Sequence, residues 1–345
     1  MVRISAPANI KLAGEHGVVH GTDCIAAAVD KLATTNAEKG SDDRVAITLK
    51  DLKESRSFRL DELSSLYRSW KEKRDIKSFI DENNKITPTM LPFAFIASRL
   101  ELEFNVPVIG TTLTSSSKVP KQKGFASSTS IGASFVGASI KLAGVHLKDE
   151  DIIDVMKDVD RIIHKDSNAG RIDIGPAYYG GYVSWSPTSG YSVEHVPQPL
   201  NFLVVDVGKK PSTSQMVGIV NIEVETYPSK TEKLFSEMKQ IVLKEKEALH
   251  SGNPALLGEL MSQNQRILKE LWVSSEGLDK MVQLAEENGA YGAKLSGGGG
   301  GGMGIVLCDP AYNDLLINVM RDAGFEAEHV QITERGVKGQ LDERT

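Results

Sequence analysis

Hydrophobic and polar residues alternate at the start of the chain in the manner of a β-strand. Val2, Ile4, Ile10 and Leu12 recur at even positions, with Pro7 as an interruption. Further along, apolar residues recur every three or four positions, which is the period of an amphipathic helix. In the first half of the chain these patterns predict strands at 2–12, 32–39, 44–50 and 107–114, helices at 60–83, 89–104, 127–143 and 149–165, and a loop followed by a strand over 166–185.

Helical periodicity dominates the second half of the chain. The run NFLVVDVGKK at 201–210 predicts a strand, and a stretch that contains Pro, Ser and Gly precedes it at 187–199. Such a stretch is typical of a domain boundary, so we expect two domains, 1–190 and 191–345. The polar tail at 335–345 is expected to fray. The remaining patterns predict helices at 213–226, 228–250, 254–271, 276–288 and 311–323 and strands at 303–308 and 325–332.

Composition adds mainly exclusions to this picture. With 345 residues, 40% of them hydrophobic and 25% charged, the chain has the make-up of a globular protein with a sizeable core. A formal net charge of −6 argues against a general nucleic-acid binder. Cys24 and Cys308 lie far apart in apolar surroundings, which favours buried thiols over a disulfide, and the histidines do not have zinc-site spacing. The N-terminal sequence does not have the pattern of a secretory signal, and apolar runs are too short to span a membrane, so we expect a cytoplasmic protein without a membrane partner.

Consecutive glycines, Gly297 to Gly302, stand between helix-like sequence and an apolar strand. Glycine adopts positive φ without steric cost, and a row of backbone N–H groups can form a concave anion site. A flexible linker is the alternative interpretation. Because the run is framed by apolar elements, we expect a loop that lies against a phosphate or a carboxylate.

A second glycine- and serine-containing stretch, GFASSTS at 124–130, opens the helix predicted at 127–143. Backbone N–H groups at a helix N-terminus attract anions, and hydroxyl groups can reach a phosphate or a metal ion. Lys118, Lys121 and Lys123 lie just upstream and strengthen this interpretation, although they could equally be a solvated surface. An ordinary serine-rich helix cap is the alternative.

Two further stretches place polar residues in unusual positions. Asn9 and Lys11 share one face of the first strand, where a lysine is costly unless it meets a partner. Glu15 and His16 follow in a glycine-flanked turn, from which they either project into a cleft or are merely exposed. Asp173 lies between isoleucines, where it could activate a hydroxyl group or simply stabilise a turn.

Taken together, these stretches resemble the GHMP kinase superfamily, and within it the mevalonate kinases. The resemblance covers nearly the whole chain, with the motifs in the expected order. The motifs that carry it are GEHGVVHG at 14–21, GFASSTS at 124–130, DIGPAYYGG at 173–181, VGKKPSTSQMV at 207–217 and YGAKLSGGGGGGM at 291–303.

The resemblance implies an α+β fold of two domains with the active site in the cleft between them. It also implies phosphorylation of a small alcohol, most similar to mevalonate phosphorylation, with ATP and Mg²⁺, by a monomer or a homodimer. The residues carried over are Asp173 and Lys11 for catalysis, Lys123, Gly124, Phe125, Ala126, Ser127, Ser128 and Thr129 with Gly297, Gly298, Gly299 and Gly300 for ATP, Asn9, Glu15, His16 and Thr213 for substrate, and Ser128 and Asp160 for Mg²⁺.

The chain departs from the family pattern at several positions. Ala8 and Asn9 stand where the family has a glycine and a lysine, and Lys11 is the candidate to replace that lysine. Asp160 is the nearest acidic residue to the family's metal-binding glutamate, one position off. The sequences around Asn9 and Phe125 lean towards diphosphomevalonate decarboxylases, whereas GEH does not. Another GHMP kinase acting on phosphomevalonate or a sugar, an ATP-dependent decarboxylase and a nucleotide-binding regulator therefore remain alternatives.

Overall fold

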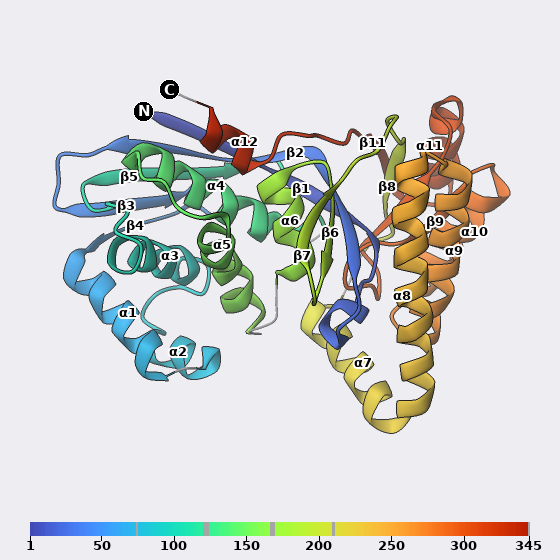
Figure 1. Cartoon of the computed structure of the whole chain (residues 1–345), viewed down its shortest axis with the longest axis horizontal. Helices are drawn as coiled ribbons and strands as arrows, with labels where there is room; N and C mark the ends of the chain where they lie inside the picture. Colours follow the sequence, from blue (N-terminus) through green and yellow to red (C-terminus); the bar gives the residue numbers. More distant parts are fainter. Residues whose placement is uncertain (74, 120–123, 166–169, 209–210, 344–345) are drawn as a thin grey trace.

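The computed structural model describes residues 1–73, 75–119, 124–165, 170–208 and 211–343. Its ribbon separates into two units, each with a β-sheet covered by helices (Figure 1). One unit contains the N-terminal sheet with α1 to α6, and the other contains the long helices α8 and α9 with the second sheet. The two chain ends lie beside each other at the edge of the first unit (Figure 1).

The first sheet has the strand order β4-β3-β5-β2-β6-β7, and β1 pairs with β2 outside this path. The strand β2 is the spine of the sheet, because it pairs with β1, β5 and β6 along its length. All pairings are antiparallel except that of β3 with β5. The strands are β1 (Val2–Ala13), β2 (Cys24–Lys39), β3 (Arg44–Leu49), β4 (Glu54–Arg59), β5 (Thr111–Ser117), β6 (Tyr182–Ser186) and β7 (Gly190–Glu194).

Helices cover one face of this sheet in two layers. The helices α4 and α6 pack directly on β1 and β2, and α5 and α3 pack outside them. The helix α4 consists of small and apolar residues almost throughout, which allows this close approach to the sheet. The helices are α1 (Leu60–Lys73), α2 (Ile76–Glu82), α3 (Leu91–Leu102), α4 (Ser127–Ala143), α5 (Asp149–His164) and α6 (Arg171–Tyr179), with 3₁₀ turns η1 (Gly17–His20) and η2 (Lys50–Leu52).

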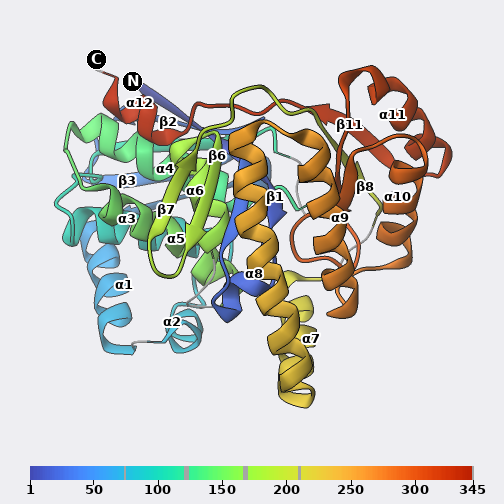
Figure 2. The same ribbon diagram turned by 45° about the vertical axis from the view of Figure 1, so that its right-hand side comes forward.

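The second sheet is antiparallel throughout, with the order β11-β8-β10-β9. Helices α9 and α10 pack on β9, and α8 packs on α9 (Figure 2). The elements are β8 (Phe202–Asp206), β9 (Gly292–Leu295), β10 (Met303–Leu307), β11 (Glu326–Val330), α7 (Thr213–Thr226), α8 (Pro228–Ser251), α9 (Pro254–Glu270), α10 (Glu276–Glu287), η3 (Pro310–Tyr312), α11 (Asn313–Asp322) and α12 (Val337–Asp342).

The strand β1 contributes to two separate hydrophobic cores. Its first half places Ile4 in the core of the first unit, whereas Ile10 and Leu12 belong to the core built around β8 and β10. Asn9 and Lys11 therefore lie where the strand passes from one core to the other. Polar side chains at this junction can face the space between the units.

Most predicted elements are confirmed, and the differences have local causes. The loop predicted after 166 is wrong, because Arg171–Tyr179 forms helix α6, with Gly170 at φ +85° as its N-terminal cap. The helix predicted at 60–83 is divided into α1 and α2, because Asp75 caps a new helix by accepting a hydrogen bond from the backbone N–H of Ser78. The strand β4 precedes them and was not predicted.

The tail was predicted to fray, and this is also wrong. It forms α12, in which Val337 is completely buried against the first unit. The side chain of Gln340 accepts from the backbone N–H of Ser5 at 3.0 Å and donates to the carbonyl of Ser5 at 2.6 Å. The two ends of the chain are thus joined by a pair of hydrogen bonds.

Candidate active site

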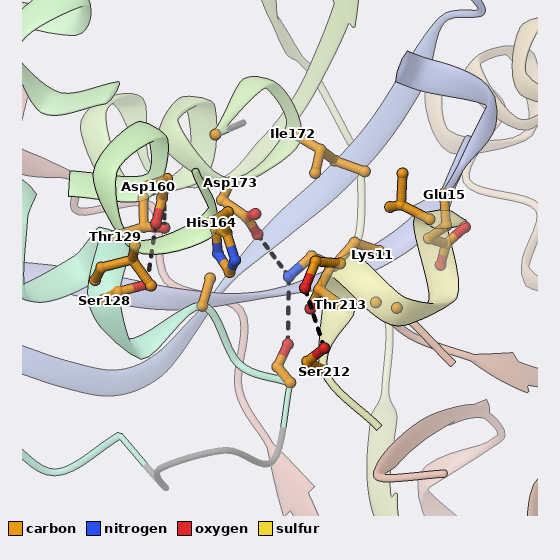
Figure 3. Close-up of a pocket in the computed structure, with 18 of the residues that line it drawn as sticks. Lys11, Glu15, Ser128, Thr129, Asp160, His164, Ile172, Asp173, Ser212 and Thr213 are labelled. Carbon is orange, nitrogen blue, oxygen red and sulfur yellow. Dashed lines mark hydrogen bonds and ion pairs between the residues drawn. The ribbon is translucent and has the colours of Figure 1, made fainter. Parts of the chain in front are cut away.

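A cavity of about 1150 Å³ lies between the two units. Its walls come from β1 and the turn after it, the start of α4, the end of α5, the start of α6, α7 and the glycine run (Figure 3). The lining includes the predicted residues Lys11, Glu15, His16, Gly124 to Thr129, Asp160, Asp173, Thr213, Gly297 and Gly298. Asn9, Gly299 and Gly300 lie behind this surface, and Lys121 and Lys123 fall outside the described residues.

Lys11 and Asp173 form an ion pair at the centre of the site. The Lys11 Nζ atom is 2.5 Å from Asp173 Oδ1, and it also donates to the carbonyl of Gly124 at 3.3 Å. The Lys11 side chain is 6% exposed and that of Asp173 is 22% exposed, so the carboxylate is the more accessible partner. Asp173 lies in the first turn of α6, which projects it towards the cavity (Figure 3).

Asn9 lies behind this pair rather than on the cavity surface. Its side-chain amide donates to the backbone carbonyl of Asp173 at 3.2 Å, and its backbone N–H donates to the carbonyl of Phe125 at 3.3 Å. The residue is completely buried. Asn9 therefore links the start of α6 to the loop before α4, and its predicted contact with substrate stays a prediction.

The loop before α4 has the geometry of an anion site. Gly124 and Ala126 both adopt positive φ, at +100° and +58°, and Ala126 occupies the N-cap position of α4. Ala126 has no side chain that could cap this helix with a hydrogen bond, so the first backbone N–H groups of α4 are available to a ligand. Lys118, which precedes the loop, is exposed.

Asp160 is held by hydroxyl groups from the first turn of α4. Ser128 donates to its Oδ1 atom at 3.0 Å, and Thr129 donates to its Oδ2 atom at 2.5 Å. Burial raises the pKa of Asp160, and the negative charge of Asp173 raises it further. His164, one turn further along α5, also lines the cavity, and its spacing from Asp160 is a signal that the sequence analysis did not use.

His16 joins the substrate-facing turn to the glycine run. Its backbone has φ +61°, and its Nε2 atom lies 3.0 Å from the carbonyl of Gly298. Burial lowers the pKa of His16 to about 4, so the ring is neutral at pH 7. Since a carbonyl only accepts, Nε2 carries the proton and Nδ1 is an acceptor, which has no partner among the described residues.

The glycine run is divided between two roles. Gly297 and Gly298 line the cavity, and a Cβ on Gly298 would be 3.3 Å from the hydroxyl of Thr213. Thr213 begins α7, which Ser212 caps. In contrast, a Cβ on Gly299, at φ +76°, would be 2.1 Å from the carbonyl oxygen of Val273. The predicted ATP contacts of Gly299 and Gly300 stay predictions.

Comparisons with known proteins agree with this architecture. Residues 93–181 match the model of the GHMP kinases N-terminal domain, and residues 246–326 match that of the GHMP kinases C-terminal domain. The chain belongs to the GHMP kinase superfamily. The expected α+β fold of two domains with a cleft between them is therefore confirmed.

Individual relatives of this GHMP kinase are similar over nearly their whole length. A mevalonate kinase of Thermococcus onnurineus is 29% identical over 98% of each chain, and one of Methanocaldococcus jannaschii is 28% identical over 88% of this chain and 91% of its own. A crystal structure of mevalonate kinase has a TM-score of 0.78 at 24% identity, covering 97% of this chain and all of its own. An L. major mevalonate kinase in complex with R-mevalonate has a TM-score of 0.73 at 22% identity, covering 97% of each chain.

The described residues show neither a membrane-spanning helix nor a cluster of metal-ligating side chains. Within the described ranges, no helix combines the length and the apolar character needed to cross a bilayer. The same residues hold no group of three or more His, Cys, Asp or Glu side chains arranged for a metal ion.

Proposed function

We propose that this GHMP kinase transfers the γ-phosphoryl group of ATP to the hydroxyl of mevalonate. The curated relatives matched over nearly their whole length are mevalonate kinases. The observation that carries the proposal within the chain is the pairing of Lys11 with Asp173 beside the anion-binding start of α4. An acceptor hydroxyl next to Asp173 would thus lie close to a phosphate held at Gly124 to Ser128.

Phosphoryl transfer depends on positioning and on charge stabilisation more than on covalent chemistry. Asp173 would orient the substrate hydroxyl and accept its proton. The ammonium group of Lys11 pairs with that carboxylate, and it lies near the position where charge develops on the transferred phosphate. Lys11 thus performs the role of the family lysine from a position two residues further along the strand.

The residues around Asp160 fit a magnesium ion. A carboxylate and a hydroxyl, from Asp160 and Ser128, are hard oxygen ligands that lie together beside the phosphate loop. Mg²⁺ commonly uses one or two protein ligands and takes the rest from phosphates and water. When bound, it would neutralise charge on the ATP phosphates. A cation there would also favour the ionised form of Asp160.

Substrate recognition would involve the opposite wall of the cavity. The Nδ1 atom of His16 is a buried acceptor without a partner among the residues described, so it suits a hydroxyl donor on the substrate. Thr213, on the facing helix α7, supplies a further hydroxyl. We also propose that the protein is cytoplasmic, that it is a monomer or a homodimer, and that its two domains divide between residues 190 and 191.

The decisive experiment measures ADP release with mevalonate, its phosphates and a panel of sugars, together with the mass of each product. We expect ADP release with mevalonate and a product heavier by one phosphoryl group. Release of CO₂ would identify the decarboxylase alternative, and absence of ADP release with every substrate would favour a binding protein.

The variant Asp173→Asn tests the assignment of the acid–base residue. We expect turnover to fall at least about a hundredfold, because general-base assistance contributes on this order. ATP binding, measured by titration calorimetry, should be largely unchanged. Turnover near that of the unmodified enzyme would exclude this role for Asp173.

A further inference from the structure

Behind the substrate-facing turn lies a group of buried polar side chains that phosphoryl transfer does not use. Lys294 on β9 and Glu245 on α8 are both 0% exposed, and Asn264 on α9 is equally buried. Glu15, in the turn that follows β1, is 4% exposed. These residues come from elements that meet between the cavity and the core of the second unit.

Lys294 uses all of its hydrogen-bond donors within this group. Its ammonium contacts Glu15 Oε1, donates to the carbonyl of Leu295 at 2.7 Å and lies 3.5 Å from the carbonyl of Lys11. A lysine has three N–H donors and no acceptor. The ammonium therefore has no N–H left for a second carboxylate.

Glu245 is the residue that this arrangement leaves without a partner. Neither of its carboxyl oxygens has a hydrogen-bond partner in the described part of the chain, and the same is true of Asn264 Oδ1. An ionised carboxylate without donors is very costly in a buried site. Burial raises the pKa of Glu245 well above its ordinary value, repulsion from Glu15 acts in the same direction, and attraction to Lys294 opposes it.

The Lys294–Glu15 ion pair, whose charges both act on Glu245, joins the same two segments as the contact made by His16. Glu15 immediately precedes His16 in the turn, and Lys294 lies on the strand that leads into the glycine run. His16 Nε2 lies 3.0 Å from the carbonyl of Gly298 in that run. The ion pair and the His16 contact therefore hold the turn against the glycine run together.

We propose that Glu245 carries a proton and acts as a positioning residue for the alcohol substrate. As a neutral acid it leaves Lys294 entirely to Glu15, and this ion pair holds the turn that presents His16 to the cavity. Loss of the proton would place a second carboxylate in competition for the same ammonium. The effect on substrate rests on the proposed function, whereas the charge state of Glu245 does not.

Denaturant unfolding as a function of pH tests the charge state without any assay of activity. The folded chain keeps a proton on Glu245 that the unfolded chain releases above pH 4.5, the ordinary value of a glutamate. The folded state then binds more protons, so stability falls as pH rises. From pH 5.5 to 7 we expect the unfolding constant of the unmodified chain, relative to Glu245→Gln, to rise about tenfold per pH unit.

The matched control is Glu247→Gln, which removes an exposed carboxylate two residues further along α8. A plot of its unfolding constant against pH should remain parallel to that of the unmodified chain. If Glu245→Gln also remains parallel, Glu245 is ionised and the inference is wrong. Glu245→Met provides the same comparison if the glutamine variant does not fold.

Steady-state kinetics test the positioning role. The KM for mevalonate of the unmodified enzyme and of Glu247→Gln should rise several-fold over the pH range in which Glu245 loses its proton, with a smaller change in kcat. The KM of Glu245→Gln should stay constant over that range. Identical KM profiles would exclude the positioning role. Diverging unfolding curves in a chain that does not phosphorylate mevalonate would instead overturn the proposed function alone.

Discussion

Lys11 connects helix α6 to the loop before α4. Its Nζ atom pairs with Asp173 and donates to the carbonyl of Gly124, while its backbone N–H donates to the hydroxyl of Ser296 at 2.8 Å. One strand residue thus contacts three segments that are far apart in sequence. This makes Lys11 the residue whose charge most directly affects both partners in the reaction.

The variant Lys11→Met tests this role. We expect kcat to fall by about 10²–10³-fold, the size typical of losing one charge-stabilising donor in an active site. Steady-state rates measure this effect.

The control for this change is Lys31→Met. The Lys31 Nζ atom is 2.6 Å from a carboxyl oxygen of Glu328, and Lys31 does not line the cavity. This variant should leave kcat unchanged. A kcat of Lys11→Met equal to that of the unmodified enzyme would exclude a role of the Lys11 charge in phosphoryl transfer.

For single residues, the sequence predicts a contact wherever local backbone geometry decides it. Strand alternation places Asn9 and Lys11 on one face, and Lys11 does meet Asp173. The burial of Asn9 behind Asp173 depends on where α6 packs, which one strand does not determine. Glu245 had a local signal, because it falls among Met238, Ile241, Val242 and Ala248 on the buried face of α8, but the charged residues that act on it come from other elements.

Among the elements, the glycine run illustrates how one sequence feature can serve two purposes. Its first residues face the loop before α4, where a Cβ on Gly297 would be 3.7 Å from the carbonyl oxygen of Gly124. The later ones pack on the loop between α9 and α10, where Gly300 donates to the carbonyl of Val273 at 2.7 Å. The sequence predicted a loop that lies against a phosphate or a carboxylate, but it did not divide the run into these parts.

Gly299→Ala tests the packing role. The added Cβ would lie 2.1 Å from a backbone oxygen and would require positive φ from alanine. We expect a loss of stability of about 1–3 kcal/mol, the usual cost of such strain, together with a raised KM for ATP. Denaturant unfolding and steady-state kinetics provide the measurements.

Gly324→Ala is the matched control, since Gly324 also has positive φ, at +88°, but a Cβ there would meet nothing within 4 Å. It should cost less stability and leave the KM unchanged. Equal costs in the two variants would mean that backbone conformation, rather than contact with Val273, requires glycine at position 299.

The helix α6 shows where local patterns fail. Gly170, Pro176 and Gly180 favour a prediction of turns over this segment. In the structure Gly170 caps the helix, Gly180 ends it, and Ile174, Ala177 and Tyr178 are buried. Tertiary packing thus overrides a local preference, and it places Asp173 on a rigid element instead of a loop.

For the whole molecule, the hairpin of β1 and β2 and the helix α12 connect parts that lie far apart in sequence. The hairpin extends through both cores, and α12 packs on α4 and α6 after the chain has completed the second unit. The resemblance to GHMP kinases implied an α+β fold of two domains, and the family models confirm that fold. The return of the tail was missed because its burial depends on a surface that distant residues form.

Removal of residues 337–345 tests the contribution of the tail. The deletion would expose the surface that Val337 covers and leave the backbone of Ser5 without Gln340. We expect a loss of about 2–4 kcal/mol, from one buried apolar side chain and a pair of hydrogen bonds. Thermal unfolding should show a lower Tm, and an unchanged Tm would contradict the packing of α12.

The return of α12 to Ser5 also constrains the order in which the protein can assemble. On the ribosome most of the first unit emerges early, yet α12, which packs on α4 and α6, follows only after the second unit. The nascent chain must therefore keep that surface uncovered while the second unit forms. A circular permutant, with the adjacent ends joined and new ends opened beyond β7, would synthesise the first unit and its final helix without interruption, and it should refold with fewer kinetic phases if this delay limits folding.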